Sequence, residues 1–245
     1  MARHEMLDNV SHRDLRIQRE YRPGCGFDFN IIRAFPGELG ALQNEYPLFL
    51  MKNTESDHFE PVAVLGFNEG ENLYLADGRW DAMALPLAIE RQPLLIGYQQ
   101  QTVDGAPTQV PVVHIDLDHP SVNREVGQPL FLPHGGESEW LQHMTAVLKS
   151  IFEGHDDIPR LSQTLIGLEL VQSITLDIEF VDGSKQSLEG LYVIDEERLA
   201  TLPGSALETL NRAGDLRSIF MLLASLPNFT RLIEHKNARL RAQAQ

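Results

Sequence analysis

Hydrophobic residues between Phe27 and Pro133 occur in short runs that are separated by polar turns. The runs are rich in β-branched and aromatic residues, which favour strands. They cover residues 46–52, 61–67, 72–76, 93–99 and 109–117. Asp77-Gly78 is a typical turn signal between two of them. The N-terminal half is therefore predicted to be rich in β-structure.

A helical period begins after Gly135-Gly136. Apolar residues then recur on one helix face at positions 140, 141, 144, 147, 148, 151 and 152. Ser138 is the expected N-cap and Gly154 the expected stop. Asp156 or Asp157 can cap a second helix with Pro159 in its first turn. The pattern predicts a pair of helices.

The last third combines a hairpin with helices. Apolar and polar residues alternate over 174–180, Asp182-Gly183 turns the chain, and 186–194 returns as the partner strand. Helices are expected after Asp195, after a capping box at 205–208, after Asp215 and after Pro227. The sequence therefore predicts an α+β fold with a β-rich N-terminal half, a helix pair, a β-hairpin and C-terminal helices.

Composition and charge narrow the function. The 245 residues carry a net charge of −15, so the body repels phosphate backbones and nucleic-acid binding is not expected. Cys25 is the single cysteine, which excludes an intramolecular disulfide. The first 22 residues mix charges without a clean period and are expected to form a mobile arm before one domain at 23–245. No signal peptide or membrane span is recognised, which favours a soluble cytoplasmic protein.

The segment 114–119, His-Ile-Asp-Leu-Asp-His, is a candidate metal site. Alternate residues of a strand share a face, so His114 and Asp116 would point the same way. Two histidines and one carboxylate form the Fe(II) site of non-haem oxygenases. His134, His143 or His155 could supply the third ligand. A polar strand face that runs into a turn is the competing interpretation.

Two further candidates lie between residues 69 and 81. Carboxylates at Glu69, Glu71, Asp77 and Asp81 would suit Ca²⁺, but their spacing matches no EF-hand loop, and a solvated acidic rim is the favoured interpretation. Arg79 and Trp80, flanked by Asp77 and Asp81, could stack on a ligand or bind a carboxylate. Alternatively, Trp80 is a core residue and Arg79 pairs with a neighbouring acid.

The same region carries a resemblance to a known family. Residues 65–73 (Leu-Gly-Phe-Asn-Glu-Gly-Glu-Asn-Leu), 77–82 (Asp-Gly-Arg-Trp-Asp-Ala), Pro86, Ile89, Arg91, Pro93 and the stretch 188–197 resemble the SapC family. The resemblance extends roughly from residue 46 to residue 232. It implies a bacterial protein whose family name is associated with surface layers, without an established reaction or cofactor. The cell surface is thus an alternative to the cytoplasm.

These observations favour a non-enzymatic binding or accessory protein, connected with the cell envelope, that takes a protein partner or a small ligand and needs no cofactor. Two alternatives stay open. One is a 2-oxoglutarate-type non-haem iron oxygenase that uses His114 and Asp116. The other is a layer-forming homo-oligomer in which Ca²⁺ bridges subunits.

Overall fold

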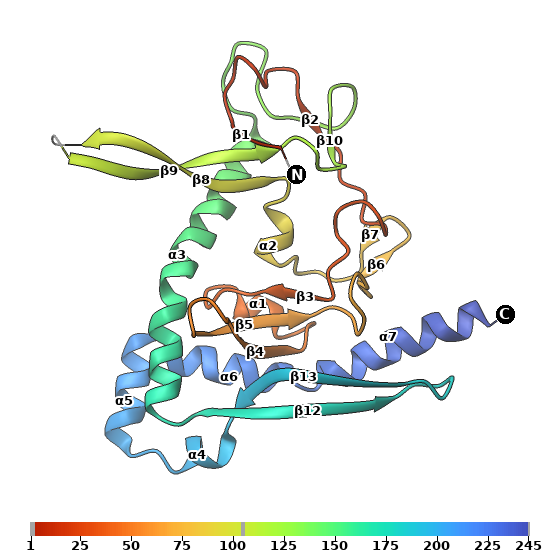
Figure 1. The fold of residues 1–245 in the computed structure, drawn as a ribbon, viewed down its shortest axis with the longest axis vertical. Helices are drawn as coiled ribbons and strands as arrows, with labels where there is room; N and C mark the ends of the chain where they lie inside the picture. Colours follow the sequence, from red (N-terminus) through yellow and green to blue (C-terminus); the bar gives the residue numbers. More distant parts are fainter. Residues whose placement is uncertain (1–2, 104–105, 245) are drawn as a thin grey trace. The chain divides into compact units, whose positions relative to one another are not determined.

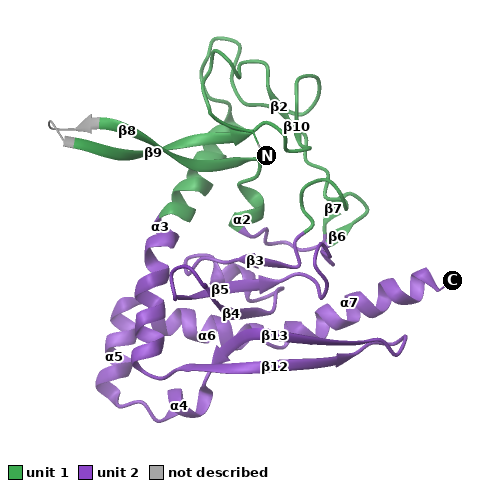
Figure 2. Ribbon diagram, viewed as in Figure 1, with its two compact units in different colours: residues 1–28, 75–80, 87–152 green, residues 29–74, 81–86, 153–245 purple. Residues whose placement is uncertain are grey.

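The computed structural model describes residues 3–103 and 106–244, which divide into two compact units (Figure 2). Unit 1 contains residues 1–28, 75–80 and 87–152, and unit 2 contains residues 29–74, 81–86 and 153–245. Both units combine antiparallel strands with helices, strands prevail in the N-terminal half and helices at the C-terminus. The predicted α+β class is confirmed.

Unit 1 is built on two small sheets. In the first, the order is β1-β9-β8, with β1 (His4–Met6), β9 (Ala106–Asp116) and β8 (Leu94–Val103). In the second, the order is β10-β2-β11, with β10 (Val122–Asn123), β2 (Arg16–Ile17) and β11 (Gln128–Pro129). The remaining elements are the pair β6 (Leu75–Ala76) and β7 (Arg79–Trp80), helix α2 (Leu87–Glu90) and the first half of α3 (Glu139–Gly167). Figure 1 shows β8 and β9 as two long antiparallel strands that lie side by side.

The start of the chain is part of unit 1, which differs from the arm expected at 1–22. β1 pairs with the end of β9, where His4 lies opposite Asp116 and Met6 opposite His114. Leu15 and Ile17 are almost completely buried, at 4% and 3% exposure. Near β2, the middle strand of its sheet, charged residues alternate with the buried Leu15 and Ile17. This alternation accounts for the mixed charges that suggested an arm. The extent of a single domain at 23–245 stays a prediction.

Unit 2 contains a five-stranded antiparallel sheet. Its order is β12-β13-β4-β5-β3, with β12 (Val171–Glu179), β13 (Lys185–Ile194), β4 (Leu48–Lys52), β5 (Phe59–Val64) and β3 (Ile31–Arg33). Its helices are α1 (Leu39–Leu42), α4 (Glu196–Ala200), α5 (Gly204–Ala213), α6 (Asp215–Ser225), α7 (Asn228–Gln243) and the second half of α3. α6 lies against β4 and β13, where buried Leu222 and Ser225 face the sheet.

The predicted hairpin is confirmed by β12 and β13. They pair from Val171 opposite Ile194 to Glu179 opposite Lys185, with a register shift between Ile174 and Leu176. The turn contains Gly183 at φ 81°, a value that glycine adopts without steric cost. Ile178 is buried while its neighbours in sequence are exposed, as the alternation predicts.

The predicted helix pair is one helix. α3 runs for 29 residues with Pro159 inside it. Ser138 caps it as expected, because its Oγ accepts from the N–H of Leu141 at 3.1 Å. Gly154 does not end the helix: a Cβ there would lie 2.9 Å from Cβ of Phe35. Gly154 is therefore present because it permits close packing of Phe35. In the sequence alone, a glycine at this position looks like the end of a helix.

Some of the helix ends near the C-terminus follow the local sequence signals, and others do not. The Asp195 carboxylate accepts from the N–H of Arg198 at 2.8 Å, so the predicted cap of α4 is confirmed. Gly214 ends α5 in the left-handed conformation, at φ 80°. The capping box at 205–208 is wrong, because α5 already begins at Gly204 and has no side-chain cap.

Two glycines of α3 give a matched stability test. Alanine is favoured over glycine in a helix by about 1 kcal/mol, but overpacking costs about 1–3 kcal/mol. We expect Gly154→Ala to lower the free energy of unfolding because of Phe35. Gly167→Ala should leave it unchanged or raise it, since no atom lies within 4 Å of its added Cβ. Urea denaturation measures both, and equal effects would show that the contact with Phe35 is unimportant.

Candidate functional site

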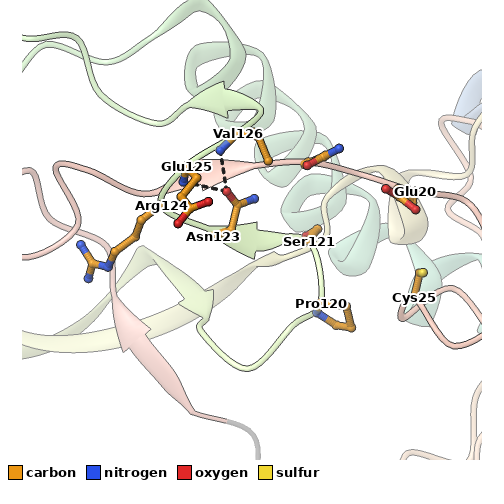
Figure 3. A pocket seen from close by; sticks show the side chains of 9 residues that line it. Glu20, Cys25, Pro120, Ser121, Asn123, Arg124, Glu125 and Val126 are labelled. Atoms are coloured by element: carbon orange, nitrogen blue, oxygen red, sulfur yellow. Dashed lines mark hydrogen bonds between the residues drawn. The ribbon is translucent and has the colours of Figure 1, made fainter.

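A cleft of about 460 Å³ in unit 1 is the candidate site (Figure 3). Its size is within the range of small-molecule sites. Two segments form it, the stretch that follows β2 and the stretch around β10. Most of the side chains in its lining are polar, among them Gln18, Glu20, Ser121, Asn123, Arg124 and Glu125. The half-buried thiol of Cys25 lies at its edge.

Hydrogen bonds that the backbone N–H groups donate fix the walls of the cleft. The N–H of Gln18 donates to the carbonyl of Ser121 at 2.9 Å. The Asn123 side-chain oxygen accepts from the N–H groups of Glu125 at 2.9 Å and Val126 at 2.8 Å, an Asx turn that Figure 3 marks with dashed lines. The Asn123 side chain thus holds the loop 123–126 in place. The charged side chains of Arg124 and Glu125 take no part in this turn and can make other contacts.

His119 contacts Ser121, a residue of the cleft lining, and holds it in place. Its Nδ1 lies 2.8 Å from the Ser121 hydroxyl and its Nε2 lies 2.9 Å from the Gln92 side-chain oxygen. Burial lowers the pKa of His119, against the opposing effect of Asp116. The neutral ring donates from one nitrogen and accepts at the other, as these partners require. Gly26 lies against the ring, since a Cβ there would be 2.6 Å from Nε2.

The hydrogen-bonded pair of Ser121 and His119 has a structural role. A serine hydroxyl beside a histidine nitrogen is also how a nucleophile and its base are placed. Here, however, Ser121 is only 3% exposed, and its own backbone N–H also donates to Nδ1, at 3.2 Å. The lone pair of Nδ1 is shared by two donors of one residue. The accessible groups of the cleft are therefore amide, carboxylate and guanidinium groups, which suit non-covalent recognition.

The predicted binding group of Asp77, Arg79, Trp80 and Asp81 lies at a tight turn. Asp77 and Gly78 form it at φ 51° and 79°, and Arg79 is exposed on β7. Trp80 is half-buried and meets the ring of Tyr21 edge-on at 5.7 Å, so packing accounts for part of its surface. Asp81 belongs to unit 2, where its N–H donates to the carbonyl of Tyr74. Binding by this group stays a prediction.

The structure does not gather the predicted iron ligands. His114 lies over Gly97 of the neighbouring strand, where a Cβ would be 2.4 Å from Nε2. The Asp116 carboxylate accepts from the N–H of Asp118 and lies 3.9 Å from Nε2 of His4, and His134 is exposed. Across residues 3–103 and 106–244, no group of three His, Cys, Asp or Glu side chains is placed to hold a metal ion.

Glu71, one of the predicted calcium ligands, stabilises unit 2. Its carboxylate accepts from the N–H of Phe67 at 2.9 Å and from the Lys236 ammonium group at 2.5 Å. A Cβ on Gly66 would lie 2.2 Å from the carbonyl oxygen of Glu71, so this loop closes tightly. Glu71 and Gly66 of the motif at 65–73 thus have structural roles, whereas Glu69 is exposed and Asp77 lies in the turn of unit 1. A calcium site stays a prediction.

Fold and cleft define an α+β protein with a polar cleft large enough for a small molecule. The family model SapC matches residues 7–232, nearly the whole chain. The chain therefore belongs to the SapC family, which confirms the resemblance seen in the sequence. No curated protein and no solved structure matches it. Within the described residues, no helix has both the length and the apolar character needed to cross a membrane.

The buried His119 predicts a pH dependence of stability. Its pKa is below the ordinary value of 6.5 in the folded protein and returns to it on unfolding, so the unfolded chain binds more protons between the two values. Stability contributed by the neutral ring is complete above about pH 7 and is lost as the pH falls below 6.5. His119→Gln should therefore reduce the loss of stability between about pH 7 and about pH 5. Exposed His134 is the control, and an equal reduction in His134→Gln would contradict the assignment.

Metal titration tests both metal hypotheses. A ligand at about 100 times its Kd adds about 2.7 kcal/mol of stability, which a thermal-shift assay detects. We expect Mn²⁺, Fe²⁺ and Ca²⁺ to leave the Tm of chelator-treated protein unchanged. A rise with Mn²⁺ or Fe²⁺ that disappears in His114→Ala would instead support the oxygenase. A rise with Ca²⁺ alone that disappears in Glu69→Gln would support the acidic rim.

Proposed function

We propose that this SapC family member is a non-enzymatic binding or accessory protein, and that the polar cleft of unit 1 holds its ligand. One observation carries the proposal: the groups that fix the cleft are bonded to each other, while Gln18, Glu20 and Arg124 are exposed in its lining. A site whose walls are already ordered has less conformational entropy to lose on binding.

The lining supports a small, neutral and polar ligand. Gln18 offers an amide that donates and accepts, and Glu20 accepts, so a ligand with several hydroxyl or amide groups can be bonded on more than one side. A cleft of about 460 Å³ has room for one or two sugar rings. An N-acetylated amino sugar of the cell envelope is neutral and is the ligand class that also fits the proposed envelope connection of the family.

A titration with N-acetylglucosamine tests the proposal. We expect shifts of the amide NMR signals of residues 18–25 and 120–126, with signals elsewhere unchanged. Gln18→Leu should raise Kd about five- to tenfold, because it removes one hydrogen-bonding side chain. Gln99→Leu is the matched control, since Gln99 is an exposed glutamine on β8 outside the cleft.

Two results would contradict this function. If N-acetylglucosamine and its β-1,4-linked dimer shift no cleft signal, the cleft does not take this ligand class. If the ligand's own NMR signals convert to those of a product in a manner that depends on the cleft residues, the protein is an enzyme.

A further inference from the structure

A second cleft of unit 1, of about 480 Å³, has a different character. Three arginines line it: Arg13, Arg16 and Arg124. Asp14 is the one acidic residue of this lining. The other residues that line it are Leu15, Pro129, Phe131, Leu132 and Pro133, which are all apolar. The cleft therefore combines a cationic side with an apolar wall.

The three guanidinium groups form a local cluster of positive charge in a chain whose net charge is −15. Some arginines elsewhere in the described residues pair with carboxylates, as Arg33 does with Glu60 at 2.7 Å and Arg160 with Asp215 at 2.6 Å. Over the described residues, no carboxylate forms an ion pair with any of the three arginines of the cleft. Their positive charge is therefore available to an anion from solution.

Backbone carbonyls hold two of these side chains in place. Arg13 donates from Nη2 to the carbonyl of Pro133 at 2.9 Å, and Arg16 donates from Nη1 to the carbonyl of Gly127 at 3.1 Å. A guanidinium group has five N–H donors, so each keeps several for a ligand. Figure 3 shows the third side chain, Arg124, extending away from Cys25 and Pro120. The arginines thus come from two segments more than 100 residues apart in the sequence.

The apolar side of the cleft is partly open to solvent. Leu132 is 48% exposed, whereas Phe131 behind it in the lining is 9% exposed. An apolar group placed against Leu132 would remove hydrocarbon surface from water, which is favourable. Inorganic phosphate alone would leave this wall uncovered.

We propose that this cleft binds a phosphate monoester that carries an apolar group, with the phosphate between the arginines and the apolar group against Leu132. A phosphate dianion offers three oxygens, which matches three guanidinium groups better than a carboxylate does. The negative body disfavours a polyanion such as nucleic acid. The site shares Arg124 with the polar cleft and is otherwise lined by different residues.

Calorimetry with hexyl phosphate and inorganic phosphate at equal ionic strength tests the proposal. We expect hexyl phosphate to bind about tenfold more tightly than inorganic phosphate, because its chain is buried. Arg124→Gln should weaken both by about tenfold, since a charged hydrogen bond is lost. Leu132→Gln should weaken hexyl phosphate alone. The control is Arg241→Gln, which makes the same charge change at an exposed residue of α7.

Several outcomes would overturn it. Failure of hexyl phosphate to bind removes the site, and equal losses in Arg124→Gln and Arg241→Gln indicate a non-specific charge effect. Equal affinity for the two phosphates contradicts the apolar wall.

N-acetylglucosamine binding that is lost in Gln18→Leu and kept in Leu132→Gln separates this site from the polar cleft. Retention on phosphatidylcholine vesicles containing phosphatidic acid assigns the phosphate to a lipid, and binding in solution alone assigns it to a free ester.

Discussion

The close approach of Gly127 to β2 is the constraint on which both clefts depend. A Cβ at Gly127 would lie 2.3 Å from the carbonyl oxygen of Ile17, so only glycine allows the two segments to meet at this distance. β2 can then pair with β10 on one side and β11 on the other. The residues that line the clefts continue directly from these pairs. Strands of only two residues thus position two sets of polar side chains.

Local signals predicted much of the fold. The hairpin of β12 and β13, the caps at Ser138 and Asp195 and the end of α5 at Gly214 depend on neighbouring residues, and the sequence shows them. Gly154 shows why the rest was missed. Its role depends on Phe35, more than 100 residues away, and no sequence pattern distinguishes a glycine that admits a neighbour from one that ends a helix.

The candidate sites were harder to predict for the same reason. Sequence motifs directed attention to His114 and Asp116 and to Arg79 and Trp80, where chemically suggestive residues are adjacent. The clefts join residues near position 16 with residues near position 124, and no spacing rule connects them. In the sequence, Arg13 and Arg16 were visible only as part of the mixed charges of the first 22 residues. The Asx turn at Asn123 and the left-handed Gly127 are local features of one of these segments.

The division into units has a consequence for synthesis of the chain. Each unit is assembled from three segments that alternate along the sequence, and α3 belongs to both (Figure 2). When residue 152 has been made and unit 1 can close, strands β3, β4 and β5 already exist, but β13, the strand that covers the edge of β4, does not. Unpaired edge strands are prone to aggregation. A nascent chain of this protein therefore carries an open sheet edge until nearly the last fifth of its length is translated.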